Sequence, residues 1–218
     1  MKKYLFTVLA LGATMMMACN PDHGKGGGEN PPVADYTLST DVIGVYLENY
    51  GDSMYGVGLN NYNLTVGAMA EDGNIKMLFV EYFTELSNKT GEGTFGPVGT
   101  ANLNFETFEG LKANTYIDAI ELEGQIMGSG YVEMNMTTEE YTVYDGIVSG
   151  DLTIKKEGEN YVVKGILTTL QGKILKVDYT GAVEFGDYSD AGGAEPLSAN
   201  KTVKANKYFS SAVKFLKK

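Results

Sequence analysis

The stretch Tyr62–Ala68, with the sequence YNLTVGA, decides the fold class because apolar and polar side chains alternate along it. A period of two with one apolar face predicts a β-strand that has one face in a core and the other toward solvent. The same alternation recurs in residues 131–136, 150–155 and 175–179. We expect the apolar set of each segment to face the core; the four sets begin with Tyr62, Val132, Gly150 and Leu175.

Turn-forming residues separate these segments and predict hairpins between them. They are Glu71–Asn74, Glu157–Asn160 and Gln171–Gly172. Short strands at roughly ten-residue spacing, without helical segments between them, are typical of antiparallel barrels and sandwiches. We therefore expect an all-β domain over residues 36–188, in which a meander of about 8–10 antiparallel strands closes into a barrel. A β-sandwich is the alternative.

A weak internal repeat is visible in the strand region. Duplication would explain it, and each half would then be a meander that closes on the other; shared hairpin sequence preferences are the alternative. Six residues recur at a constant offset of 99 positions: Gly51, Asp52, Asn61, Tyr62, Gly73 and Ile75 return as Gly150, Asp151, Asn160, Tyr161, Gly172 and Ile174.

Cys19 ends a segment that is typical of a bacterial lipoprotein signal peptide. Two lysines precede the apolar run Tyr4–Thr14, which is too short to span a bilayer core of about 30 Å. Met16–Cys19 resembles a lipobox, in which the cysteine is diacylated before the protease cuts on its N-terminal side. We expect residues 1–18 to be removed and Cys19 to carry a lipid that anchors the protein in a membrane. An ordinary secretory signal with a chance cysteine is the alternative.

The remaining segments differ in composition from the strand region. Residues 19–35 are rich in Gly and Pro and predict a flexible tether. Residues 189–202 predict a linker, and residues 203–218 predict an amphipathic helix with Thr202 as its N-cap. We expect this helix to pack on the barrel, with binding to membrane lipid as the alternative. Its apolar face contains Ala205, Tyr208, Phe209, Ala212, Val213, Phe215 and Leu216, and its polar face contains Lys204, Lys207, Lys214, Lys217 and Lys218.

The charge balance excludes several classes of partner. The whole chain has a formal charge of −11, and residues 19–200 carry nine lysines against 28 acidic residues, a formal charge of −19. Such a domain repels nucleic acid and anionic lipid headgroups. The chain also has no arginine, so it lacks a two-pronged clamp for phosphate or carboxylate. We therefore expect no nucleic-acid partner and favour a neutral or cationic ligand.

The single histidine, His23, lies in the expected tether, and Cys19 is the only cysteine. The strand region therefore has neither a Ser-His or Cys-His nucleophile system nor His and Cys ligands for zinc. We expect no cofactor, no metal and no enzymatic activity. Carboxylate chemistry is the alternative, since a glycosidase needs two carboxylates about 5–10 Å apart. Its candidate residues are Glu133, Glu139, Glu140, Asp145 and Asp151.

Tyrosine is abundant, at 15 residues, and four tyrosines gather early in the strand region: Tyr46, Tyr50, Tyr55 and Tyr62. Tyrosine rings can stack on sugars, so a glycan site is one hypothesis; the other is that strands favour tyrosine and bury it. Asp52-Ser53-Met54 resembles the acceptor of a bacterial envelope O-glycosylation system. Ser53 is therefore a candidate modification site.

The lipobox, the Gly-rich tether and several turn-and-strand signatures together resemble small envelope lipoproteins of anaerobic Gram-negative bacteria. The signatures are Tyr50–Asp52, Asn61–Leu64, Gly93–Phe95 and Tyr179–Gly181. Several proteins of this group are similar to calycin-like barrels, so the resemblance implies a calycin-like barrel here. It also implies an outer-membrane lipoprotein of the cell envelope, on the periplasmic face or the cell surface, and it implies no catalytic residue.

Three functions compete at this point. The first is non-catalytic binding of a small apolar or neutral ligand inside the barrel, which an open apolar lumen would favour. The second is a surface module that binds a glycan or a protein through exposed tyrosines. The third is a carboxylate-based hydrolase, which two inward carboxylates in one cleft would favour. The sequence does not identify ligand-binding residues for any of them.

Overall fold

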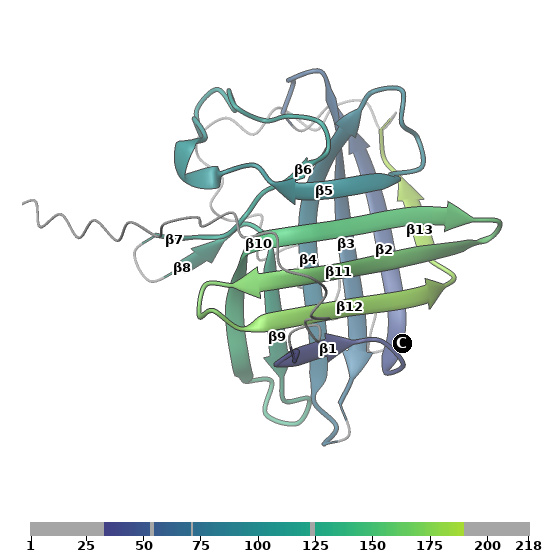
Figure 1. Cartoon of the computed structure of the whole chain (residues 1–218), viewed down its shortest axis with the longest axis vertical. Helices are drawn as coiled ribbons and strands as arrows, with labels where there is room; N and C mark the ends of the chain where they lie inside the picture. Colours follow the sequence, from purple (N-terminus) through teal and green to yellow (C-terminus); the bar gives the residue numbers. More distant parts are fainter. Residues whose placement is uncertain (1–32, 53–54, 71, 123–124, 190–218) are drawn as a thin grey trace, which may run out of the picture. The chain divides into compact units, whose positions relative to one another are not determined.

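The computed structural model describes residues 33–52, 55–70, 72–122 and 125–189 (Figure 1). The described residues form thirteen β-strands and one short 3-10 turn, η1 (Thr100–Asn102), which confirms the all-β class. Cys19, Ser53 and the helix expected at residues 203–218 lie outside the described residues.

Two three-stranded antiparallel meanders form most of the domain and run across each other (Figure 1). The N-terminal meander consists of β2 (Val42–Gly51), β3 (Leu59–Met69) and β4 (Ile75–Glu85). The C-terminal meander consists of β10 (Tyr141–Glu157), β11 (Asn160–Thr169) and β12 (Ile174–Gly181). The hairpin connections between β3 and β4, β10 and β11, and β11 and β12 fall at the three predicted turns.

The other strands are short and lie at the edges or between the meanders. β1 pairs with β12 and β13 pairs with β2, both in parallel, and β7 and β8 form a separate hairpin. Their bounds are β1 (Tyr36–Leu38), β5 (Gly93–Pro97), β6 (Thr115–Tyr116), β7 (Ile120–Leu122), β8 (Gln125–Met127), β9 (Gly130–Met134) and β13 (Glu184–Asp187).

Strand β10 closes the barrel because it pairs with strands of both meanders' sheets. Its first part, Tyr141–Gly146, pairs with β9, and its later part pairs with β11 and β5. A β-bulge between Ile147 and Ser149 bends the strand between these two parts. Gly150, with a φ of 102°, then approaches β11 so closely that a Cβ would collide with the carbonyl oxygen of Ile166.

The barrel is closed, but the expectation of about 8–10 antiparallel strands around it is wrong in two respects. The closed ring contains five strands, which are β10, β5, β6, β4 and β9. The sheet is also mixed, because β5 and β6 pair in parallel, as β1 and β13 do with their neighbours. The bend in β10 is the physical reason: it joins the two sheets early, so the remaining strands extend from the ring as outer strands.

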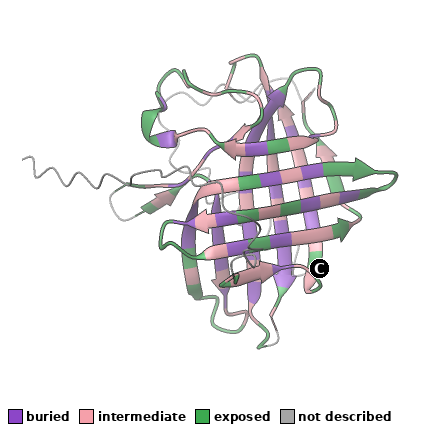
Figure 2. Cartoon of the chain, in the orientation of Figure 1, coloured by how far each residue is buried: buried purple, intermediate pink, exposed green. Residues whose placement is uncertain are grey.

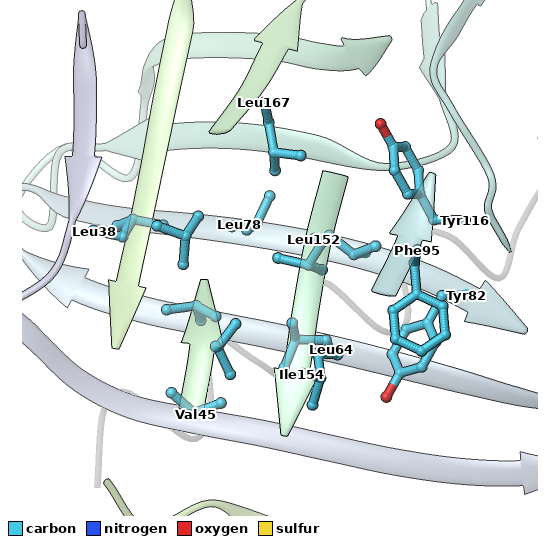
Figure 3. Packing of buried hydrophobic residues seen from close by; sticks show 14 of the residues in the cluster. Leu38, Val45, Leu64, Leu78, Tyr82, Phe95, Tyr116, Leu152, Ile154 and Leu167 are labelled. Atoms are coloured by element: carbon cyan, nitrogen blue, oxygen red, sulfur yellow. The ribbon is translucent and has the colours of Figure 1, made fainter. Parts of the chain in front are cut away.

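Large side chains fill the interior between the two meanders (Figure 3). The apolar sets that begin with Tyr62, Gly150 and Leu175 face this core, as expected. The expectation for β9 is wrong, because Tyr131 faces the core while Val132 lies on the opposite face of the sheet. That opposite face is also apolar, so alternation could not distinguish the two faces.

The later positions of the repeat occupy corresponding places in the two meanders, whereas Gly51 ends β2 and Gly150 lies within β10. Gly73 and Gly172 lie in the second hairpin of each meander with φ angles of 80° and 74°. Tyr62 in β3 and Tyr161 in β11 both face the core. The repeat therefore matches the second and third strands of the two meanders.

Candidate functional site

A loop of residues 86–92, between β4 and β5, is held by the hydroxyls of three core tyrosines. Tyr62 donates a hydrogen bond to the carbonyl oxygen of Asn88 (3.0 Å), and Tyr82 donates one to that of Gly91 (2.9 Å). Tyr161, from the other meander, donates to the carbonyl oxygen of Thr90 (3.3 Å). Both meanders thus fix the same loop from the core side.

Burial raises the pKa of all three tyrosine hydroxyls above the usual value. Each hydroxyl therefore stays protonated near neutral pH and can donate to a carbonyl oxygen. Much of the tyrosine in this chain consequently has a structural role. It supplies apolar rings for the core and hydroxyl donors for the carbonyl groups of the loop.

Side chains within the loop and across to β10 fix it further. Asn88 donates to the carbonyl oxygen of Glu92 (2.7 Å) and accepts from the backbone N–H of Gly91 (3.0 Å). The Glu92 carboxylate accepts from the Thr90 hydroxyl (2.6 Å) and from the backbone N–H of Lys156 (2.8 Å). These two hydrogen bonds lower the pKa of Glu92, which keeps the carboxylate ionised.

A hollow of about 350 Å³ lies beside this loop. Three segments form its walls, namely the loop itself, the hairpin between β10 and β11, and the chain from the end of β12 into β13. Its volume is within the range of small-molecule sites. The residues that line it are Lys89, Thr90, Lys156, Gly158, Glu159, Tyr161, Val183 and Phe185.

The lining combines one exposed aromatic side chain, Phe185, with hydrogen-bond donors and acceptors. The Lys156 ammonium lies 5.8 Å from the centre of the Tyr161 ring, and the Phe185 side chain is 39% exposed. Within the described part of the chain, five lysines make ion pairs with carboxylates, whereas Lys89, Lys112 and Lys156 make none. Together with Glu159, the site offers cationic donors and a carboxylate acceptor beside exposed apolar surface.

The four early tyrosines do not form one site. Tyr62 is in the core, and the Tyr46 hydroxyl donates to the Glu184 carboxylate. Tyr50 stacks on Tyr188 with ring centres 5.4 Å apart. Tyr55 packs edge-on against Phe83 and Phe108 and donates to the Glu81 carboxylate (2.7 Å).

The five candidate carboxylates are also dispersed. Glu133 and Asp145 belong to the paired strands β9 and β10, and their side chains lie on the core side of the sheet. Glu133 accepts from the Tyr131 hydroxyl (2.6 Å), and Asp145 is fully buried and accepts from the backbone N–H of Gln171 (3.3 Å). The other three, Glu139, Glu140 and Asp151, are exposed, and none of the five lines the hollow. Over the described residues, no group of three acidic, His or Cys side chains is placed to hold a metal ion.

No protein-family model, no curated protein and no solved structure matches this chain. Among the described residues, no helix is long and apolar enough to span a membrane.

Sequence reasoning did not find the hollow. Lys89, Lys156 and Phe185 belong to three segments that only the closed fold brings together. The single usable signal was the Lys155-Lys156 pair beside a predicted turn in an otherwise acidic region.

Proposed function

We propose that this chain is a lipid-anchored cell-envelope protein whose β-domain binds a small, neutral, hydroxyl-rich ligand, such as the end of a glycan, without catalysis. The observation that carries the proposal is the lining of the hollow. Sugar recognition combines an aromatic face for the apolar side of a ring with donors and acceptors for its hydroxyls. Phe185 supplies the aromatic face, and Lys89, Lys156 and Glu159 supply the donors and acceptors.

A neutral ligand suits the charges around the hollow. Two lysines lie there with Glu159, while Glu92 and Asp187 hold lowered pKa values nearby because they accept hydrogen bonds from neighbouring groups. The domain as a whole is strongly acidic, so it would repel a highly charged anion before contact.

Binding inside the barrel is the less favoured hypothesis. The interior between the meanders is occupied by side chains such as Tyr82, Phe95 and Tyr116, each at most 1% exposed (Figure 3). A ligand there would have to displace packed core groups, at a cost of several kcal/mol.

The anchoring part of the proposal rests on Cys19 and the tether after it. Lipid chains on Cys19 would hold the protein in the outer membrane, on the periplasmic face or the cell surface. A flexible tether of residues 19–35 would place the domain roughly 20–25 Å from the lipid on average. Intact mass of the protein purified from its own envelope tests this: a mature chain that begins at Cys19 with acyl chains supports it, and an unlipidated N-terminus contradicts it.

Amide NMR titration of the unlipidated domain with a panel of neutral monosaccharides and disaccharides tests the ligand site. We expect at least one sugar to shift the amide signals of residues 88–92 and 156–161. Phe185→Ala should weaken that sugar's binding about tenfold, because one aromatic face is worth about 1–1.5 kcal/mol.

The matched control is Phe105→Ala, which removes an equally exposed phenylalanine that does not line the hollow. This variant should bind the sugar as the parent does. Equal weakening by both variants would contradict the assigned site, and a panel without any shift at the loop would contradict the glycan class.

A further inference from the structure

A second apolar cluster lies on the outer face of the N-terminal meander, away from the barrel core. Met77 and Ile75 of β4 and Val132 of β9 form it, and all three side chains are 0% exposed. Their neighbours Leu78 and Tyr131 point the other way, into the core. Phe79 and Met136 pack against the cluster and are partly buried.

An outer face of this kind requires an apolar cover. A sheet that faces water on one side has polar side chains there, whereas a sheet covered on both faces has apolar side chains on both. The C-terminal meander has the first pattern, with exposed Lys164 and Lys176 on its outer face. β4 has the second, in the unbroken apolar run Met77–Val80.

We propose that the C-terminal segment, residues 203–216, docks on this outer face and forms this cover. This inference is independent of the sugar site. The position at which the described chain ends supports it. Tyr188 donates its backbone N–H to the carbonyl oxygen of Asn49 (2.7 Å) in β2, and its ring stacks on Tyr50. The chain therefore leaves the described region along β2, which belongs to the same sheet.

The lengths are compatible. Residues 190–202 can span up to about 43 Å when extended. The cluster lies about five residues along β2 and three strands across, a path of roughly 30 Å. A helix of residues 203–216 would be about 21 Å long, enough to cross the strands β2, β3, β4 and β9, which are together about 14 Å wide between outer axes.

The chemistry of the segment also matches the face. Its apolar side contains Phe209, Ala212, Val213 and Leu216, which would meet the cluster. Its lysines would remain outside, where they reduce the negative charge of the domain. On the same outer face, Glu48 and Glu81 have pKa values raised by burial. Carboxylates that lose water in this way gain from nearby ammonium groups.

A spin-label experiment on the full mature chain tests the location directly. Cys19→Ser removes the only cysteine, and Ser210→Cys then places one nitroxide on the lysine side of the segment, where the label does not disturb the docked apolar face. We expect the label to broaden most of the amide signals of residues 75–79 and 130–134 and to leave those of residues 161–169 sharp. Broadening at other positions, or at none, would overturn the proposal.

Thermal unfolding supplies a second test. Phe209→Ser combined with Leu216→Ser should lower the Tm of the full soluble chain by roughly 5–10 °C. The control pair, Lys207→Gln with Lys214→Gln, should leave the Tm within about 2 °C. The competing membrane hypothesis predicts an unchanged Tm in the first pair together with weaker sedimentation on anionic phospholipid vesicles, and that result would overturn the docking.

Discussion

The two meanders share hairpin order and turn positions but differ on their outer faces. The outer face of the C-terminal meander is polar, with Lys164 and Lys176 paired to Asp178 at 3.3 and 3.8 Å. The corresponding face of the N-terminal meander has fully buried Met77 and Phe83. Figure 2 shows the difference as exposed bands along β10, β11 and β12.

This difference shows that similar hairpins do not imply a similar surface. Both meanders contribute to one core, and the turns that connect their strands have similar glycine conformations. Only the residues on the outer face indicate whether a sheet is covered on one face or on both. A β-rich domain therefore has to be compared face by face, because strand order alone would assign the same role to both sheets.

The test with the largest expected effect replaces one residue on the outer face of each meander by aspartate. Met77→Asp should destabilise the domain by about 4 kcal/mol or more, because it removes a buried side chain and buries a charge without a partner. Ile166→Asp, at an outer position that is 48% exposed, should cost less than about 1 kcal/mol. Urea denaturation of both variants measures the two costs, and equal costs would remove the distinction between the faces.

The strands and turns followed from the sequence because they depend on local patterns. Period-two alternation located β3 and β12 and assigned their core faces correctly, since each has one apolar face. It assigned β9 wrongly, because Tyr131 and Val132 are both buried, in different clusters. The unbroken apolar run in β4 was the available sign of a doubly covered strand.

The ring size and the hollow could not be predicted for a different reason. The five-strand ring depends on one bulge in β10, which carries no reliable local signal. The hollow depends on Lys89 and Lys156 converging from segments that are far apart in sequence. Such long-range placement follows from closure of the whole sheet.

A second test concerns the glycines of two turns, one within reach of the core tyrosines and one in solvent. Gly91 has a φ of 70°, and a Cβ there would lie 2.6 Å from the Tyr82 hydroxyl oxygen. Gly91→Ala should therefore cost about 2–3 kcal/mol, from backbone strain and displacement of that hydroxyl. Gly158 has a φ of 65° with open space around it, so Gly158→Ala should cost about 1 kcal/mol. Thermal unfolding of both variants measures the two losses of stability. Losses that are equal within error would show that the contact with Tyr82 is unimportant.

A third, smaller test compares the two tyrosines that hold the loop from opposite meanders. Tyr62→Phe should cost about 1–2 kcal/mol, because it removes a 3.0 Å hydrogen bond from a fully buried ring. Tyr161→Phe should cost about 0.5–1 kcal/mol, since its 3.3 Å bond is longer. Both variants should speed amide hydrogen exchange in residues 88–91, while residues 174–180 stay unchanged. A loop whose exchange rate does not change in either variant would show that the hydroxyls do not fix it.

The smallest effect is a difference in pH dependence between Glu81 of the N-terminal meander and Glu92 of the loop bound to β10. Burial raises the pKa of Glu81, so its contribution to stability is present below about pH 4.5 and is lost as the pH rises through the folded-state pKa. Hydrogen bonds from Thr90 and Lys156 lower the pKa of Glu92, so its contribution is present above about pH 4.5 and is lost as the pH falls.

Relative to the parent, Glu81→Gln should therefore gain Tm as the pH rises from 4.5 to 7, and Glu92→Gln should lose Tm over the rise from pH 3 to 5. Glutamine can still accept the hydrogen bonds that Tyr55 and Asn61 donate to position 81, so the comparison isolates the charge. Profiles that move in the same direction would show that the two carboxylates do not lie in opposite environments.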